Sequence, residues 1–246
     1  MADRPARIDT SNIETQRVEH DGVPLTVARP TGEARGAVIV VQEAFGVTPH
    51  IADVAARAAV AGYLSVAPHL FHRSVDSSFG YDQLDLVLPE MAKINAETLT
   101  ADLDGAVAYL HENGFSDRAI GTVGFCMGGS VTLYAAATRE LGAAVTFYGG
   151  GLSTGRFGLS PLLDYAPNFS TPWLGLFGSA DPGIPVEEVQ QLKAAATKAP
   201  VPTEVVIYEG ANHGFHCDDR PAAFDPKAAA DGWERTLAWF AEYVES

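Results

Sequence analysis

The segment Gly121–Ser130 places a thiol where a buried strand is expected to run into a helix. Gly124 and Gly128 flank Cys126 at positions −2 and +2, which is the Gly-x-nucleophile-x-Gly spacing of a nucleophile elbow with Cys in place of the usual Ser. The turn is expected to force Cys126 into a left-handed conformation with its sulfur over the sheet. A structural cysteine in a glycine-rich turn is the alternative, but the spacing favours a nucleophile.

Two backbone N–H groups could stabilise the oxyanion that such a nucleophile creates. Met127 N–H opens the helix after Cys126 and would face a bound acyl group, and the helix N-terminus also favours a thiolate. In this kind of fold the second donor comes from the loop after an earlier buried strand, so Ala44 N–H is the candidate. Glu43 precedes it and is either a functional carboxylate or a cap of the next helix.

A base and an acid are expected on later loops. His213 follows the last predicted strand, in the segment Glu209–Phe215, and His216 is its closest competitor among the seven histidines. Asp181 lies at the carboxyl end of the preceding strand, where it could fix the imidazole tautomer. The chain order nucleophile, acid, base is that of α/β-hydrolases.

The elements that must position these residues alternate between short apolar runs and helical runs. This pattern predicts an α/β-hydrolase fold, with a mostly parallel central sheet, helices on both faces and an N-terminal edge hairpin over residues 13–29. Residues 1–246 are expected to form a single domain. The remaining strands are predicted at 36–42, 63–67, 119–125, 143–148, 173–178 and 204–208, and helices at 49–62, 89–113, 127–139, 187–198 and 227–243.

Two segments, 71–88 and 149–171, lack periodicity and follow strands. They are therefore expected at the carboxyl end of the sheet, where open α/β sheets bind their ligands.

Composition excludes several classes of partner. The net charge of −15 repels nucleic acid and anionic membrane surfaces, so an anionic substrate would need a local arginine. The first residues carry no apolar secretory signal, and no apolar run approaches the length of a membrane span. Two cysteines fit a reducing compartment and no zinc site, so a cytoplasmic protein is expected, although one disulfide stays possible.

These motifs resemble the dienelactone hydrolase family from about Val38 to Phe240. The resemblance rests on Gln42–Gly46, Ala67–Arg73, Gly124–Gly129, Tyr148–Gly150, Gly178–Asp181 and His213–Phe215. It implies hydrolysis of a small ester or lactone, with no metal or organic cofactor.

The resemblance also implies roles for individual residues. Cys126, His213 and Asp181 would form the triad, and Glu43 would pair with the resting thiol and take its proton when substrate binds. Arg73 would bind a substrate carboxylate. Phe45 and Phe215, within the shared motifs, are expected to line the substrate site.

The chain departs from the family at a second substrate-binding arginine, four residues after the histidine. Cys217 stands there, and Arg220 lies three residues further on. The partner is therefore expected to be a small ester or lactone, carboxylated or neutral, and the chain a monomer or small homo-oligomer. For Arg73, pairing with a structural carboxylate such as Asp76 or Asp82 is the alternative role.

Two alternative functions stay open at this point. One is a carboxylesterase or thioesterase that uses the same triad on another small ester. The other is a non-hydrolytic thiol sensor or ligand-binding module, which would have no need of the histidine and aspartate in this order.

Overall fold

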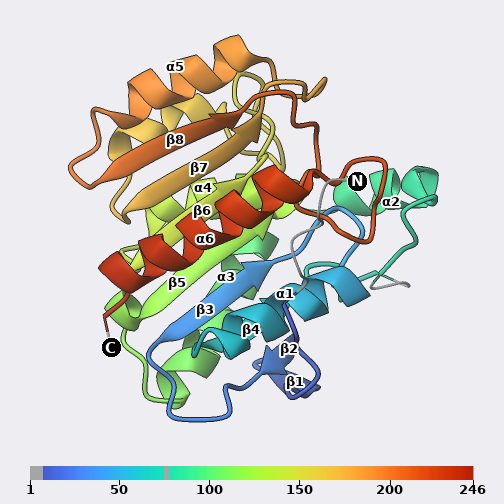
Figure 1. Cartoon of the computed structure of the whole chain (residues 1–246), viewed down its shortest axis with the longest axis vertical. Coiled ribbons are helices and arrows are strands. Elements are labelled where there is room, and N and C mark those ends of the chain that lie inside the picture. Colours follow the sequence, from blue (N-terminus) through green and yellow to red (C-terminus); the bar gives the residue numbers. More distant parts are fainter. Residues whose placement is uncertain (1–7, 75–77, 246) are drawn as a thin grey trace.

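The computed structural model describes residues 8–74 and 78–245 and contains an eight-stranded sheet (Figure 1). Its strand order is β1-β2-β4-β3-β5-β6-β7-β8, and neighbouring strands from β4 to β8 are parallel. The strands are β1 Thr15–His20, β2 Val23–Ala28, β3 Ala37–Val41, β4 Leu64–Pro68, β5 Ile120–Phe125, β6 Ala143–Phe147, β7 Trp173–Gly178 and β8 Thr203–Tyr208. The predicted fold class is confirmed.

The N-terminal hairpin forms the antiparallel edge that its turn sequence predicts. β1 pairs with β2, and the two turn residues Asp21 and Gly22 have φ of 50° and 78°. Aspartate and glycine tolerate this left-handed region, which a two-residue hairpin turn requires.

Helices cover both faces of the sheet. The helices α1 Pro49–Val60 and α6 Pro226–Tyr243 lie on one face, and α3 Ala96–Glu112 and α4 Met127–Thr138 lie on the other (Figure 1). The helix α5 Val186–Ala196 packs beside β8, the edge strand. Most strand residues are fully buried between these layers, which explains their near-continuous apolar runs.

One predicted helix is wrong. The expected helix at 89–113 is two helices, α2 Leu84–Met91 and α3, because Asn95 starts a new one. Its side chain accepts a hydrogen bond from Thr98 N–H at 3.0 Å, and Thr98 Oγ1 accepts one from Asn95 N–H at 3.1 Å. This capping box ends the preceding turn and sets the start of α3.

The carboxyl ends of the parallel strands lead into the segments that the sequence singled out. β3 leads to Glu43, β5 to Cys126, β7 to Asp181 and β8 to His213. The segment after β6 holds only two short 3-10 turns, Leu162–Asp164 and Ala166–Asn168. Within the described ranges, no helix is long and apolar enough to cross a membrane.

Candidate active site

Cys126 occupies a strained turn between β5 and α4. Its φ of 55° and ψ of −112° are unusual for a residue with a side chain. A Cβ on Gly124 would lie 2.0 Å from the carbonyl oxygen of Gly128, and a Cβ on Gly128 would lie 2.3 Å from the carbonyl oxygen of Val41. Both glycines are therefore required by close backbone contacts, and the turn has the elbow geometry.

His213 joins this thiol to a buried carboxylate. Its Nδ1 lies 2.7 Å from Oδ2 of Asp181, and its ring also interacts with the Cys126 side chain. Burial lowers the pKa of His213, but the bonds to Asp181 and Cys126 outweigh it and raise the pKa to about 10. The structure thus brings Cys126, His213 and Asp181 together in one chain of contacts.

The competing histidine lies elsewhere. His216 is buried among the rings of Phe125, Phe147 and Trp233, and burial holds its pKa well below the usual value. A neutral imidazole in this aromatic cluster is a core residue.

The two candidate oxyanion donors lie on the predicted loops. Met127 is the first residue of α4, so its N–H has no acceptor within the helix. Ala44 is buried in the loop after β3, and its N–H makes no backbone hydrogen bond to the described residues. Neither N–H therefore has a backbone hydrogen-bond partner among the described residues.

Glu43 is buried but only weakly bonded. Its Oε2 accepts a hydrogen bond from Tyr81 at 3.4 Å, and its Oε1 has no partner among the described residues. Burial raises the pKa of Glu43, and the charges of His50, Arg220 and His213 oppose the rise. The pairing with the resting thiol that the resemblance implies is therefore not seen, and Oε1 is an unused acceptor.

Arg73 does not lie where the sequence analysis expected it. Its guanidinium forms two hydrogen bonds with Asp102, of 2.9 and 2.7 Å, and the described residues around the cavity beside His213 do not include it. The carboxylate of Asp102 is 1% exposed. Arg73 thus neutralises a buried structural carboxylate, although that partner is neither Asp82 nor Asp76, which lies outside the described residues.

The two phenylalanines expected at the substrate site differ in their surroundings. Phe215 is fully buried against Phe147, Tyr148 and Tyr208, so it is a core residue and its expected substrate contact is wrong. Phe45 packs edge-on against Tyr81, with ring centroids 4.9 Å apart, and lies under the guanidinium of Arg220.

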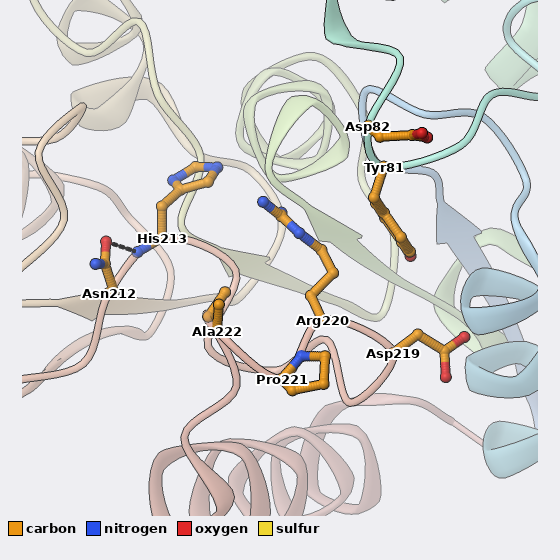
Figure 2. Close-up of a pocket in the computed structure, with 9 residues that line it drawn as sticks. Tyr81, Asp82, Asn212, His213, Asp219, Arg220, Pro221 and Ala222 are labelled. Atoms are coloured by element: carbon orange, nitrogen blue, oxygen red, sulfur yellow. Dashed lines mark hydrogen bonds between the residues drawn. The ribbon is translucent and has the colours of Figure 1, made fainter.

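A cavity of about 550 Å³ opens beside His213. Figure 2 shows the imidazole of His213 and the guanidinium of Arg220 directed into the same space, while the carboxylates of Asp82 and Asp219 point away from it. Arg220 lies 5.3 Å from the ring centroid of Tyr81 and 5.7 Å from that of Phe45. Within the described ranges it forms no ion pair, so the cavity holds an available cation.

The sequence analysis left open whether Arg220, three residues beyond the family position, reaches the site. Successive turns close this segment, with backbone hydrogen bonds from Cys217 to Gly214 and from Arg220 to Cys217. These turns return Arg220 to the cavity. Tyr81 was missed altogether, because it lies in a segment without periodicity and no spacing rule singles it out.

The described residues contain no group of His, Cys, Asp or Glu side chains that could hold a metal ion.

Comparison with known proteins gives consistent matches. The model of the dienelactone hydrolase family matches residues 23–244. A Salmonella typhimurium LT2 protein, provisionally named a carboxymethylenebutenolidase, is 39% identical over 248 residues, covering 99% of this chain and 91% of its own length. The carboxymethylenebutenolidase of Rhodococcus opacus is 29% identical and is covered to 93%. A crystal structure provisionally titled a dienelactone hydrolase, from Klebsiella pneumoniae, superimposes with a TM-score of 0.83 at 35% identity, covering 94% of this chain and 99% of that one.

Proposed function

Since this chain belongs to the dienelactone hydrolase family and is a hydrolase of that type, we propose that it cleaves a small ester or lactone through Cys126, His213 and Asp181. The observation that carries the proposal is the contact chain from the elbow thiol through His213 to the buried Asp181. A structural cysteine would need neither the strained turn nor the histidine and aspartate.

The first half-reaction is acyl transfer to sulfur. The Cys126 thiolate attacks the carbonyl carbon, and the carbonyl electron pair moves onto oxygen, where Met127 and Ala44 N–H groups donate to it. Such donors typically contribute about 3 kcal/mol each to the transition state. The tetrahedral intermediate collapses, the carbon–oxygen bond breaks, and protonated His213 gives its proton to the leaving oxygen.

The second half-reaction releases the acid. Neutral His213 takes a proton from water, the resulting hydroxide attacks the thioester, and Cys126 leaves as thiolate. Asp181 holds the imidazole through Nδ1 in both steps, so the other ring nitrogen faces the reacting groups. Glu43 accepts the thiol proton when Cys126 is protonated, a role supported by its unused Oε1.

The charge in the cavity favours a substrate that carries a carboxylate. Arg220 offers a planar, two-pronged cation beside His213, in a chain whose net charge of −15 would otherwise repel an anion. It takes the place that the sequence analysis gave to Arg73. Carboxylated enol lactones fit this site because their leaving enolate is easily expelled by a thiolate.

The experiment that tests this function compares hydrolysis of p-nitrophenyl acetate and of a carboxylated enol lactone by the wild type and by Cys126→Ala. We expect the wild type to cleave both and the variant to cleave neither above background, with an unchanged circular dichroism spectrum. Full turnover by Cys126→Ala would reject the nucleophile, and no turnover by the wild type on any small ester or lactone would favour a thiol sensor or ligand-binding module.

A further inference from the structure

A second cysteine, histidine and aspartate lie together behind the candidate site. Nδ1 of His50, on α1, lies 2.9 Å from Oδ1 of Asp218, and the His50 ring also interacts with the thiol of Cys217. His50 and Cys217 are both 0% exposed, so no substrate can reach this thiol. The arrangement therefore needs an explanation other than nucleophilic catalysis.

Cys217 is connected to Glu43 through one hydroxyl group. The Cys217 thiol donates to Tyr81 Oη at 3.3 Å, and Tyr81 Oη–H donates to Oε2 of Glu43 at 3.4 Å. Tyr81 has a single proton to donate. Tyr81 Oη also lies 3.4 Å from Thr48 Oγ1, and either atom of that pair can donate. When the Cys217 thiol and the Thr48 hydroxyl donate to Tyr81, its proton is directed to Glu43, and a carboxylate that accepts a hydrogen bond is favoured over the protonated acid.

His50 lies behind Cys217, at the end of this row of side chains that is farthest from Glu43. Its Nδ1 is bonded to Asp218, and its buried Nε2 has no hydrogen-bond partner within the described ranges, so the imidazole acts on the Cys217 thiol through its charge. Burial lowers the pKa of His50, but the bonds to Asp218 and Cys217 outweigh it and raise the pKa to about 10. A charged imidazole places a positive charge at the far end of this row of side chains, and the carboxylate of Glu43 lies at the near end.

The other charged and titratable groups around this chain come from several elements. Glu43 also faces His213 and Arg220 from the loop after β8 and Tyr148 from the end of β6. His50 also faces His216, and Asp218 is bonded to Arg57. Burial raises the pKa of Glu43, and the charges of His50, Arg220 and His213 and the hydrogen bond from Tyr81 lower it, so the Tyr81 bond acts in the same direction as these charges.

We propose that Cys217 and His50 are positioning residues that act through Tyr81 to keep Glu43 ionised and able to accept the proton of Cys126. This inference rests on the proposed function, since it assumes that Glu43 is the proton acceptor. It assigns a purpose to the Cys217 position, where the family resemblance leads one to expect a substrate-binding arginine. In place of a residue that contacts the substrate directly, this position holds Cys217, which acts on the proton acceptor Glu43.

The test uses the pH dependence of kcat/KM for p-nitrophenyl acetate. Cys217→Ala removes the donor to Tyr81, so Glu43 should ionise less readily and the acidic limb should move to higher pH by about 0.5–1 pH unit, with little change in KM. Cys217→Ser keeps a group that donates to Tyr81, and it should restore the wild-type limb. His50→Phe, which removes the positive charge at the far end, should move the limb in the same direction as Cys217→Ala.

Val205→Ala is the matched control, because it deletes a comparable volume from the core at β8 and leaves the side chains from His50 to Glu43 unchanged. The acidic limb of the kcat/KM profile of this variant should stay at the wild-type pH even if its melting temperature falls. A Cys217→Ala profile that overlays the wild type would overturn the inference, as would equal shifts in Cys217→Ala, Cys217→Ser and Val205→Ala. These outcomes are distinct from failure of the proposed function, which would show as retained turnover in Cys126→Ala.

Discussion

Nδ1 of His213 lies 2.7 Å from Oδ2 of Asp181, whose side chain is 1% exposed. The other carboxylate oxygen accepts the backbone N–H of Gly183 at 2.8 Å, so Asp181 is held in one orientation. A buried carboxylate fixed in this way also fixes the tautomer of the imidazole that it contacts. The other ring nitrogen of His213 is therefore the one that can give a proton to the leaving oxygen and later take one from water.

Asp181→Asn should abolish most turnover without unfolding the chain. The amide is close in size to the carboxylate but can bind the wrong tautomer of His213, and it no longer stabilises the imidazolium. We expect kcat to fall by about 10³-fold or more. Steady-state kinetics and thermal melting together check this. Turnover within a few-fold of the wild type would remove Asp181 from the triad.

Arg220→Ala should separate charged from neutral substrates. The loss of a charged contact that leaves a buried partner unpaired costs about 2–5 kcal/mol, so kcat/KM for a carboxylated lactone should fall by tens-fold or more. A neutral aryl ester should be barely affected. Arg220→Lys is the control that keeps the charge but loses the two-pronged geometry, and it should fall between the two. Equal losses on both substrates would contradict a carboxylate anchor.

Arg73→Ala should instead reduce stability. Any loss of activity should be equal for the carboxylated lactone and the neutral ester. Among the described residues, the substitution leaves the buried carboxylate of Asp102 with His72 Nε2, 3.0 Å away, as its remaining side-chain partner. Because Arg73 itself is 43% exposed, we expect a loss of about 1–3 kcal/mol in the free energy of unfolding. Urea denaturation measures this. A selective loss of activity on the carboxylated lactone, with unchanged stability, would return Arg73 to the substrate site.

Glu43→Gln should reduce activity while removing a pH-dependent destabilisation. The pKa of Glu43 is raised by burial, so the unfolded chain releases this proton at a pH where the folded chain still holds it. The contribution of Glu43 to stability is therefore full below its unfolded pKa and is lost as pH rises towards its folded pKa. The free energy of unfolding should fall less steeply with pH above about 4.3 in the variant than in the wild type. Equal slopes, together with full turnover, would reduce Glu43 to a loop residue.

The sequence predicted the strands, the hairpin and the chain order of the candidate triad because each depends on local pattern. Gly124 and Gly128 are demanded by close backbone contacts, and Asp181 and His213 lie in the loops that follow β7 and β8. Arg73 and Phe215 were assigned wrongly because their partners, Asp102 and Phe147, are distant in sequence. The contacts of Cys217 with Tyr81 and His50 likewise join segments that no spacing rule connects.

The identity of the nucleophile is tested most directly by trapping the acyl-enzyme. His213→Ala removes the group that activates water, so p-nitrophenyl acetate should acylate this variant faster than water can release the acyl group. Acid quenching followed by peptide mass spectrometry should find the acetyl group on the peptide that contains Cys126. An acetyl group on Cys217 or on a serine instead, or acetylation at the same rate in a Cys126→Ala, His213→Ala double variant, would contradict the assignment of Cys126.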